Sequence, residues 1–181
     1  MCYKQNITFD DIKNLVQHSL EDFYTQDSIL FDCSAENEAV SERCMMFHIG
    51  WYMLTRMKTL EKFHWADLDC EYNRHFEDIK SMHVFGLDGY SQESKGIIPD
   101  LLIHKRMSDE NNLLVIEFKK GTPSSERRNN DYRKLTYFTD TSKEYRYDVG
   151  LYIELHKNEA IVKVYQDGAH KKHLDYTVYP E

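Results

Sequence analysis

The sequence predicts an α/β fold, with a central mixed β-sheet flanked by helices. Apolar residues in the N-terminal part recur at the spacing of a helix face, which indicates two long helices. The rest of the chain carries short apolar runs bounded by turn-forming residues, and one polar helical segment interrupts them. The order helix, helix, three strands, helix and further strands is typical of a layered α/β sandwich.

The first helix is predicted from about Phe9 to Tyr24. Thr8 precedes it as a candidate N-cap, and Asp10 and Asp11 favour the positive end of the helix dipole. Its apolar stripe consists of Ile12, Leu15, Val16, Leu20 and Phe23. That stripe predicts one buried helix face.

The second and longest helix is predicted from about Ala35 to Lys58, with Ser34 as its N-cap. Its apolar residues are too numerous for a single narrow stripe. They are Val40, Cys44, Met45, Phe47, Ile49, Trp51, Tyr52 and Leu54. We therefore expect neighbouring elements to cover most sides of this helix.

Three strands, a polar helix and further strands follow. The strands are predicted at Leu68–Asn73, Ile97–Lys105, Leu113–Lys119, Asp148–Leu155, Ala160–Gln166 and Leu174–Tyr179, and the helix at Ser125–Thr139. Turn-forming residues mark loops at Gly86–Lys95, Ser108–Asn112 and Gly121–Ser125. We expect a single domain over residues 1–181, with residues 1–33 as an N-terminal helical extension and residues 34–181 as the core.

Composition narrows the class of protein. Hydrophobic residues make up 41% of the chain and charged residues 30%, which is typical of soluble globular proteins. There is no apolar run of eighteen residues and no apolar signal region at the start, so we expect a cytoplasmic protein without a membrane partner. The four cysteines form no CxxC pair, which favours free thiols. The net charge of −8 argues against loose, charge-driven binding to nucleic acid.

An acidic residue interrupts an apolar strand at Asp100. The predicted strand around it, Ile97–Ile103, is otherwise nearly all apolar, as expected of a strand covered on both faces. A carboxylate buried there needs a cation, hydrogen bonds or a shifted pKa, because burying it without a partner costs several kcal/mol. Pro99 removes a hydrogen bond from the sheet, which predicts an irregularity at that point.

The next strand repeats the pattern with Glu117 and Lys119. Side chains two residues apart on a strand face the same way, so these two project together while Phe118 points to the opposite face. If the two strands pair as a hairpin, Asp100 and Glu117 lie near one another. Two carboxylates make an oxygen-rich site suited to Mg²⁺ or Mn²⁺, and Lys119 adds an amine that can act on a scissile phosphate.

These residues resemble the signature of the PD-(D/E)xK nuclease superfamily, which has the restriction-endonuclease-like fold. Pro99-Asp100 and Glu117-Phe118-Lys119 match the signature itself. The helical segment Glu42–Met53 resembles the helix that these nucleases place before the sheet, and the segments Asp69–Arg74, Ile103–Arg106 and Asp131–Leu135 resemble parts of small stand-alone bacterial members. The resemblance runs from about Glu42 to Leu155 and implies a restriction-endonuclease-like core with αβββαβ order.

The resemblance also implies roles for individual residues. Asp100 and Glu117 would ligate the metal together with the Phe118 carbonyl, and Lys119 would position or activate the attacking water. Glu42 would contribute from the helix, directly or through a metal-bound water, with Glu38 one turn earlier as the alternative acid. The candidates for contact with nucleic acid are Lys134, Arg133, Glu71 and Arg74.

The function that follows is a divalent-metal-dependent nuclease that hydrolyses phosphodiester bonds with metal-activated water and leaves a 5′-phosphate. The resemblance favours DNA over RNA as the substrate and a homodimer as the assembly. One alternative is an inactive adaptor that keeps the nuclease fold and binds nucleic acid or protein. Another is a nuclease subunit of a defence or mobile-element system, in which a partner protein supplies targeting.

A zinc site is the weakest of the metal interpretations. His64, Cys70, His75 and His83 lie within twenty residues of one another, but they show neither CxxC nor HxxxH spacing.

Overall fold

The computed structural model of the protein describes residues 3–32, 40–72, 74–75, 78–79, 81–85 and 92–180, and between residues 73 and 96 it describes the backbone alone. The α-helices are α1 (Phe9–Asp27), α2 (Glu42–Thr59) and α3 (Ser125–Thr139). The strands are β1 (Asp67–Cys70), β2 (Arg74–His75), β3 (Asp78–Ile79), β4 (Ser81–Phe85), β5 (Gln92–Gly96), β6 (Leu101–His104), β7 (Leu114–Lys120), β8 (Val149–His156), β9 (Glu159–Gln166), β10 (Ala169–His170) and β11 (Tyr176–Val178). Short 3₁₀ turns lie at Lys4–Asn6, Ser28–Phe31, Glu61–Phe63, Asp109–Asn111 and Lys172–Leu174.

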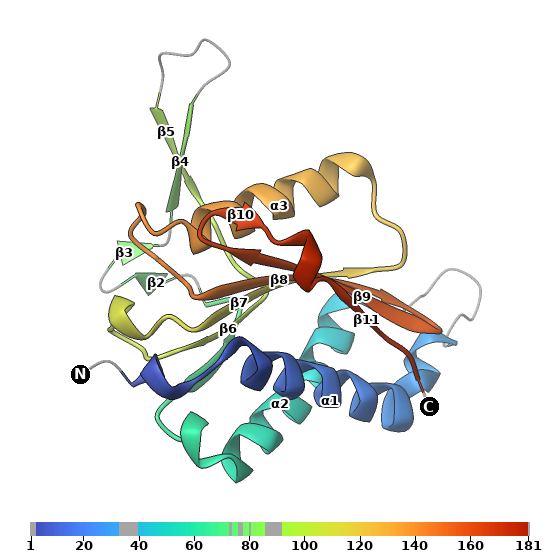
Figure 1. Ribbon diagram of the computed structural model, residues 1–181. Helices are drawn as coiled ribbons and strands as arrows, with labels where there is room; N and C mark the ends of the chain where they lie inside the picture. The colour runs from blue at the N-terminus through green and yellow to red at the C-terminus, as the bar shows by residue number, and fades with distance from the viewer. Residues whose placement is uncertain are drawn as a thin grey trace.

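Seven strands form a mixed central sheet in the order β1-β6-β7-β8-β9-β10, with β11 paired to β9. Strands β7 and β8 are parallel, and α3 connects them, while the other neighbouring strands are antiparallel. Two hairpins, β2–β3 and β4–β5, are inserted between β1 and β6. The β4–β5 hairpin projects from the body of the protein (Figure 1). The predicted class, an α/β protein with a mixed sheet flanked by helices, is therefore confirmed.

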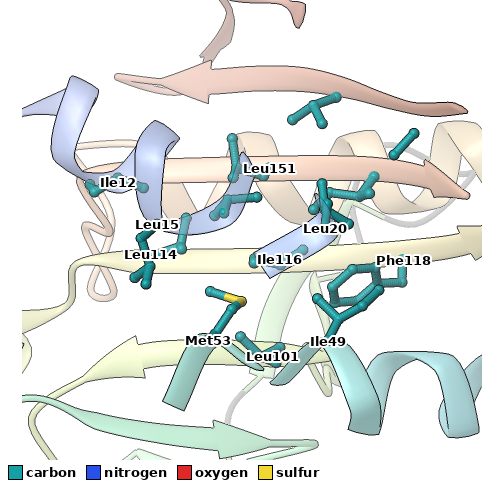
Figure 2. Close-up of a cluster of buried hydrophobic side chains, with 14 of the residues drawn as sticks. Ile12, Leu15, Leu20, Ile49, Met53, Leu101, Leu114, Ile116, Phe118 and Leu151 are labelled. Atoms are coloured by element: carbon teal, nitrogen blue, oxygen red, sulfur yellow. The ribbon is translucent and has the colours of Figure 1, made fainter. Parts of the chain in front are cut away.

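The helices cover opposite faces of the sheet. Helices α1 and α2 pack on one face, and α3 packs on the other (Figure 1). The core under α1 and α2 is built mainly of aliphatic side chains and methionines, and Figure 2 shows Leu15 of α1 beside Leu114 of β7. The smaller core under α3 is rich in tyrosine, with Tyr137, Tyr145, Tyr147, Tyr152 and Tyr165. Glycine lets α3 approach this face closely, because a Cβ at Gly150 would lie 3.0 Å from Cγ2 of Thr139.

Helix α1 begins where the sequence predicts and extends one turn further, to Asp27. Thr8 and Asp11 form a capping box, in which each side chain accepts the other residue's backbone N–H. The predicted stripe is buried and joins the same hydrophobic cluster as α2. Helix α1, which lies in the predicted N-terminal extension, thus contributes to the same hydrophobic core as α2.

Two predictions about α2 are wrong. The helix begins at Glu42 instead of Ala35, because Ser41 has extended backbone and its side chain caps the helix at the N–H of Cys44. The predicted cap Ser34 and residues 35–39 lie outside the described residues. Nor is the helix covered on most sides, since Phe47 is 61% exposed and Trp51 58% exposed within the described structure.

The two strands that carry the candidate site pair as predicted. Strands β6 and β7 form an antiparallel hairpin in which Leu101 lies opposite Ile116. Strand β6 begins after Asp100 instead of at Ile97, which agrees with the irregularity predicted at Pro99. Helix α3 has the predicted bounds. Part of the predicted loop Gly86–Lys95 has strand backbone as β5, while residues 86–91 lie outside the described part of the chain.

The described part of the chain contains no helix that is both long enough and apolar enough to cross a membrane.

Candidate functional site

The candidate site lies where β7 extends beyond the start of β6. Continuing the register by one pair places Asp100 opposite Glu117, because Leu101 pairs with Ile116. Beyond this point none of the described strands pairs with β7 on that edge, and its N–H groups need other acceptors. Asp100 Oδ2 accepts the N–H of Phe118 at 2.7 Å, and Glu42 Oε2 accepts the N–H of Lys120 at 2.9 Å. Two carboxylates therefore line the open edge of the strand.

Glu117 is the most unusual group in the site. Its side chain is 0% exposed and points to the α3 face of the sheet, between strand residues that are otherwise apolar. Its Oε2 lies 2.8 Å from the amine of Lys134, but its Oε1 has no hydrogen-bond partner among the described residues. A buried carboxylate oxygen without a partner costs free energy of folding, and the β7 backbone does not need a carboxylate at this position. Glu117 thus has an acceptor available for a ligand.

Lys119 projects from the same face two residues further along β7. Its amine lies 3.0 Å from Asp131 Oδ2 on α3, 3.5 Å from Glu42 Oε1 on α2, and 2.6 Å from the Phe118 carbonyl. The side chain is 15% exposed, so the amine is held within the protein. Side chains from α2 and α3, which cover opposite faces of the sheet, therefore both contact the Lys119 amine.

The charges in the site shift one another's pKa values. Burial and the charge of Asp100 raise the pKa of Glu117 well above its usual value, although Lys134 opposes the shift. Burial also raises the pKa of Asp100, against the effects of the Phe118 N–H and of Lys119. Burial alone would lower the pKa of Lys119, but the nearby carboxylate of Asp131 outweighs it and raises that pKa. Without a cation the carboxylates favour protonation, while Lys119 stays an ammonium at neutral pH.

The structure brings together five of the residues predicted from the sequence: Asp100, Glu117, Phe118, Lys119 and Glu42. Glu42 reaches the end of β7 from the first turn of α2. The alternative acid, Glu38, lies outside the described residues. Phe118 has its side chain in the apolar core and its carbonyl beside the Lys119 amine. The peptide groups of this strand residue point to the open edge, where Asp100 takes its N–H.

The residues predicted to contact nucleic acid are more scattered. Lys134 belongs to the site itself, through its ion pair with Glu117. Arg133 is exposed on the outer side of α3, beside a shallow depression lined by Tyr132 and Tyr137. Glu71 pairs with Arg43 at 2.7 Å, and its backbone N–H bonds the Asp100 carbonyl at 3.0 Å. The side chain of Arg74 lies outside the described part of the structure.

Sequence reasoning did not single out Asp131. This residue is 4% exposed, and its carboxylate lies within ion-pair distance of both Lys119 and Lys134. The spacing of three between Asp131 and Lys134 puts both on one face of a helix, and this was the signal available in the sequence. Which face meets the sheet depended on the packing of α3.

A second polar group lies next to the site on β8. Glu154, which is paired with Lys119 in the sheet register, forms a two-pronged ion pair with Arg128 of α3, with both distances 3.1 Å. Its carboxylate also accepts the hydroxyl of Tyr152. These contacts give both carboxylate oxygens of Glu154 a partner. They also extend the polar region between α3 and the sheet away from Glu117.

The donor set suits a hard divalent cation. Among the described residues, no three His, Cys, Asp or Glu side chains are grouped closely enough to bind a metal ion by themselves. The unpartnered oxygen of Glu117, the neighbouring Asp100 carboxylate and the Phe118 carbonyl are nevertheless the oxygen ligands that Mg²⁺ or Mn²⁺ takes, with water in the remaining positions. These residues fit such an ion.

Comparison of the chain with protein-family models, with curated proteins and with solved structures finds no match.

Proposed function

We propose that this protein is a divalent-metal-dependent nuclease of the PD-(D/E)xK superfamily, with a restriction-endonuclease-like core. The observation that carries the proposal is the fully buried Glu117, which has one oxygen without a partner among the described residues, the charge of Asp100 close enough to raise its pKa, and Lys119 on the same strand. A carboxylate pair with an ammonium group on adjacent strands is a donor set for binding a cation and a phosphodiester together. DNA is the proposed substrate ahead of RNA, by analogy with the superfamily.

The chain's own residues divide the chemistry between them. Asp100 and Glu117 supply the carboxylate oxygens for Mg²⁺ or Mn²⁺, and the bound ion would polarise the phosphoryl oxygen and acidify water. Lys119 carries a proton at neutral pH, because Asp131 raises the pKa of its amine. A protonated amine donates hydrogen bonds and does not accept a proton. Lys119 therefore orients the attacking water and balances charge on the scissile phosphate.

The test is cleavage of single-stranded DNA, double-stranded DNA and RNA in the presence of Mg²⁺, Mn²⁺ or EDTA. Wild-type protein is expected to cleave in the presence of metal only. Asp100→Ala and Lys119→Ala are expected to lose at least about a hundredfold in rate. The exposed residues Glu126 and Lys172 offer matched controls, and Glu126→Ala and Lys172→Ala should keep wild-type rates.

The same experiment separates the nuclease from an adaptor. Nucleic-acid binding that survives Asp100→Ala and needs no metal, in protein that never cleaves, would contradict the proposal and favour a binding role. Cleavage that appears only with a co-purified protein would instead identify a nuclease subunit that requires a targeting partner.

A further inference from the structure

Asp131 differs from the other acids of the site in two ways. Its described contacts are with lysine amines and not with backbone N–H groups, and it is not a residue of the PD-(D/E)xK signature. It lies on the face of α3 that packs against the sheet, together with Leu135 and Phe138, and it is 4% exposed. Burying a carboxylate there is costly unless cations compensate it. The contacts of Asp131 therefore identify the cations that compensate its buried charge.

Its two oxygens serve two different lysines. Asp131 Oδ2 lies 3.0 Å from the amine of Lys119 as an ion pair without hydrogen-bond geometry, and Oδ1 lies 3.4 Å from the amine of Lys134. Lys134 in turn pairs with Glu117 at 2.8 Å. One carboxylate from α3 thus links the amine of the signature lysine to the amine that pairs with the signature glutamate.

The other acidic partner of Lys119 holds it less closely. Glu42 Oε1 lies 3.5 Å from the amine, and the Glu42 side chain is 37% exposed. Asp131 Oδ2 lies closer to the Lys119 amine, at 3.0 Å. Its side chain is only 6% exposed, so solvent screens its charge less than that of Glu42. Fixing a lysine side chain costs up to about 2 kcal/mol of rotamer entropy, and a buried anion on a helix is a suitable anchor.

We propose that Asp131 is a positioning residue of the nuclease site, which acts by holding the Lys119 ammonium at the open edge of β7. The inference rests on the proposed function of that site. In this proposal Asp131 acts only through Lys119, and the metal and the phosphate are bound by other residues. A displacement of about 1 Å of a catalytic group can cost roughly a hundredfold in rate, so the anchor matters even though it stays outside the reaction.

The first test compares Asp131→Asn, Asp131→Glu and the control Glu126→Gln, which changes an exposed acid of the same helix. For each variant, kcat, KM and the affinity for Mn²⁺ are measured, the last by calorimetry. Asp131→Asn should lose about 30- to 100-fold in kcat, with KM and the Mn²⁺ dissociation constant within about threefold of wild type. Asp131→Glu should recover part of kcat, and Glu126→Gln should match wild type.

Two outcomes of this test would overturn the proposal. A wild-type kcat in Asp131→Asn would mean that Lys119 needs no anchor. A loss of Mn²⁺ affinity as large as that of Asp100→Ala would make Asp131 a metal ligand instead of a positioning residue. Unfolding curves of each variant identify any loss of rate that comes from loss of structure.

The second test needs no activity, so it separates this proposal from the proposed function. In protein labelled with nitrogen-15, the Lys119 ammonium should give an NMR signal with slow hydrogen exchange, assigned by its loss in Lys119→Arg. Asp131→Asn and Asp131→Glu are compared without metal. The signal should be lost in Asp131→Asn and kept in Asp131→Glu, whereas an unchanged signal in Asp131→Asn would refute the anchor. Failure of wild-type protein to cleave any substrate would count against the nuclease, and the NMR result would still decide the role of Asp131.

Discussion

Two acids on the same face of the sheet, the partly buried Asp69 and the fully buried Glu117, have opposite surroundings. Asp69 on β1 accepts Nε2 of His104 at 2.9 Å and Nε of Arg106 at 2.8 Å, and it also pairs with the second guanidinium nitrogen of Arg106. Glu117 on β7 has one amine partner, one oxygen without a partner, and Asp100 as an acidic neighbour. The first acid is fully paired by the chain itself, and the second is not.

The pKa values express the same contrast. Burial favours the neutral form of Asp69, but the hydrogen bonds from His104 and Arg106 outweigh burial and hold its pKa well below the usual range. Burial and Asp100 together raise the pKa of Glu117. An acid with a structural role is charged in the folded protein, and donors of the chain itself pair with its oxygens. An acid that binds a cation lacks such partners until the cation is bound. This difference separates the paired Asp69 cluster from the proposed metal site around Glu117.

The largest effect is expected from breaking the Asp69 cluster. Asp69→Ala should lower the free energy of unfolding by about 3 kcal/mol at pH 7, because the buried His104 and the guanidinium of Arg106 lose their acceptor. Urea denaturation measures the change. Asp32→Ala removes an exposed pair with Lys157 and should cost less than about 1 kcal/mol.

The sign of the pH dependence adds to this prediction. Since the pKa of Asp69 is lowered in the folded state, its contribution is present above the unfolded value of 3.8 and is lost as the pH falls toward the folded value. The deficit of Asp69→Ala relative to wild type should therefore shrink below about pH 4. A deficit that stays constant down to pH 2 would show that packing, and not the charge, is responsible.

Metal binding should stabilise the protein through the Glu117 cluster alone. At about 100 times its dissociation constant, Mg²⁺ or Mn²⁺ adds about 2.7 kcal/mol, which corresponds to a rise of roughly 5–10 °C in Tm for a chain of this size. Thermal unfolding with and without metal measures the rise. Asp100→Asn should abolish it and Asp69→Asn should keep it, and an equal rise in both variants would place the metal elsewhere.

A third effect is the pH dependence contributed by Glu117 in the absence of metal. Because its folded pKa is raised above the ordinary value of 4.5, its stabilising contribution is complete below that value and declines as the pH rises through the folded pKa. The slope is at most about 1.4 kcal/mol per pH unit. Glu117→Gln should therefore be progressively more stable than wild type from pH 5 to pH 8 in urea denaturation with EDTA, and parallel curves would contradict the raised pKa.

Much of the fold followed from local patterns. The bounds of α3, the start of α1 and the β6–β7 hairpin were predicted because each depends on nearby residues: a cap, a stripe or an alternation. The start of α2 was missed because Ser34 and Ser41 are equally good caps by residue type, and the backbone at Ser41 decides between them. The exposure of Phe47 and Trp51 was missed because composition says how apolar a helix is, and not what packs against it.

By itself, the sequence determined which residues of the candidate site share a strand and a face. Glu117 and Lys119 project together because strand side chains alternate with a period of two, and Asp100 meets them because the two strands form a hairpin. The resemblance named Glu42 and Lys134 as candidates, but only the tertiary structure showed that α2 brings Glu42 to the end of β7 and that Asp131 and Lys134 of α3 pair with Lys119 and Glu117. Charges from distant segments interact over a few ångströms, and the packing of helices on the sheet alone sets those distances.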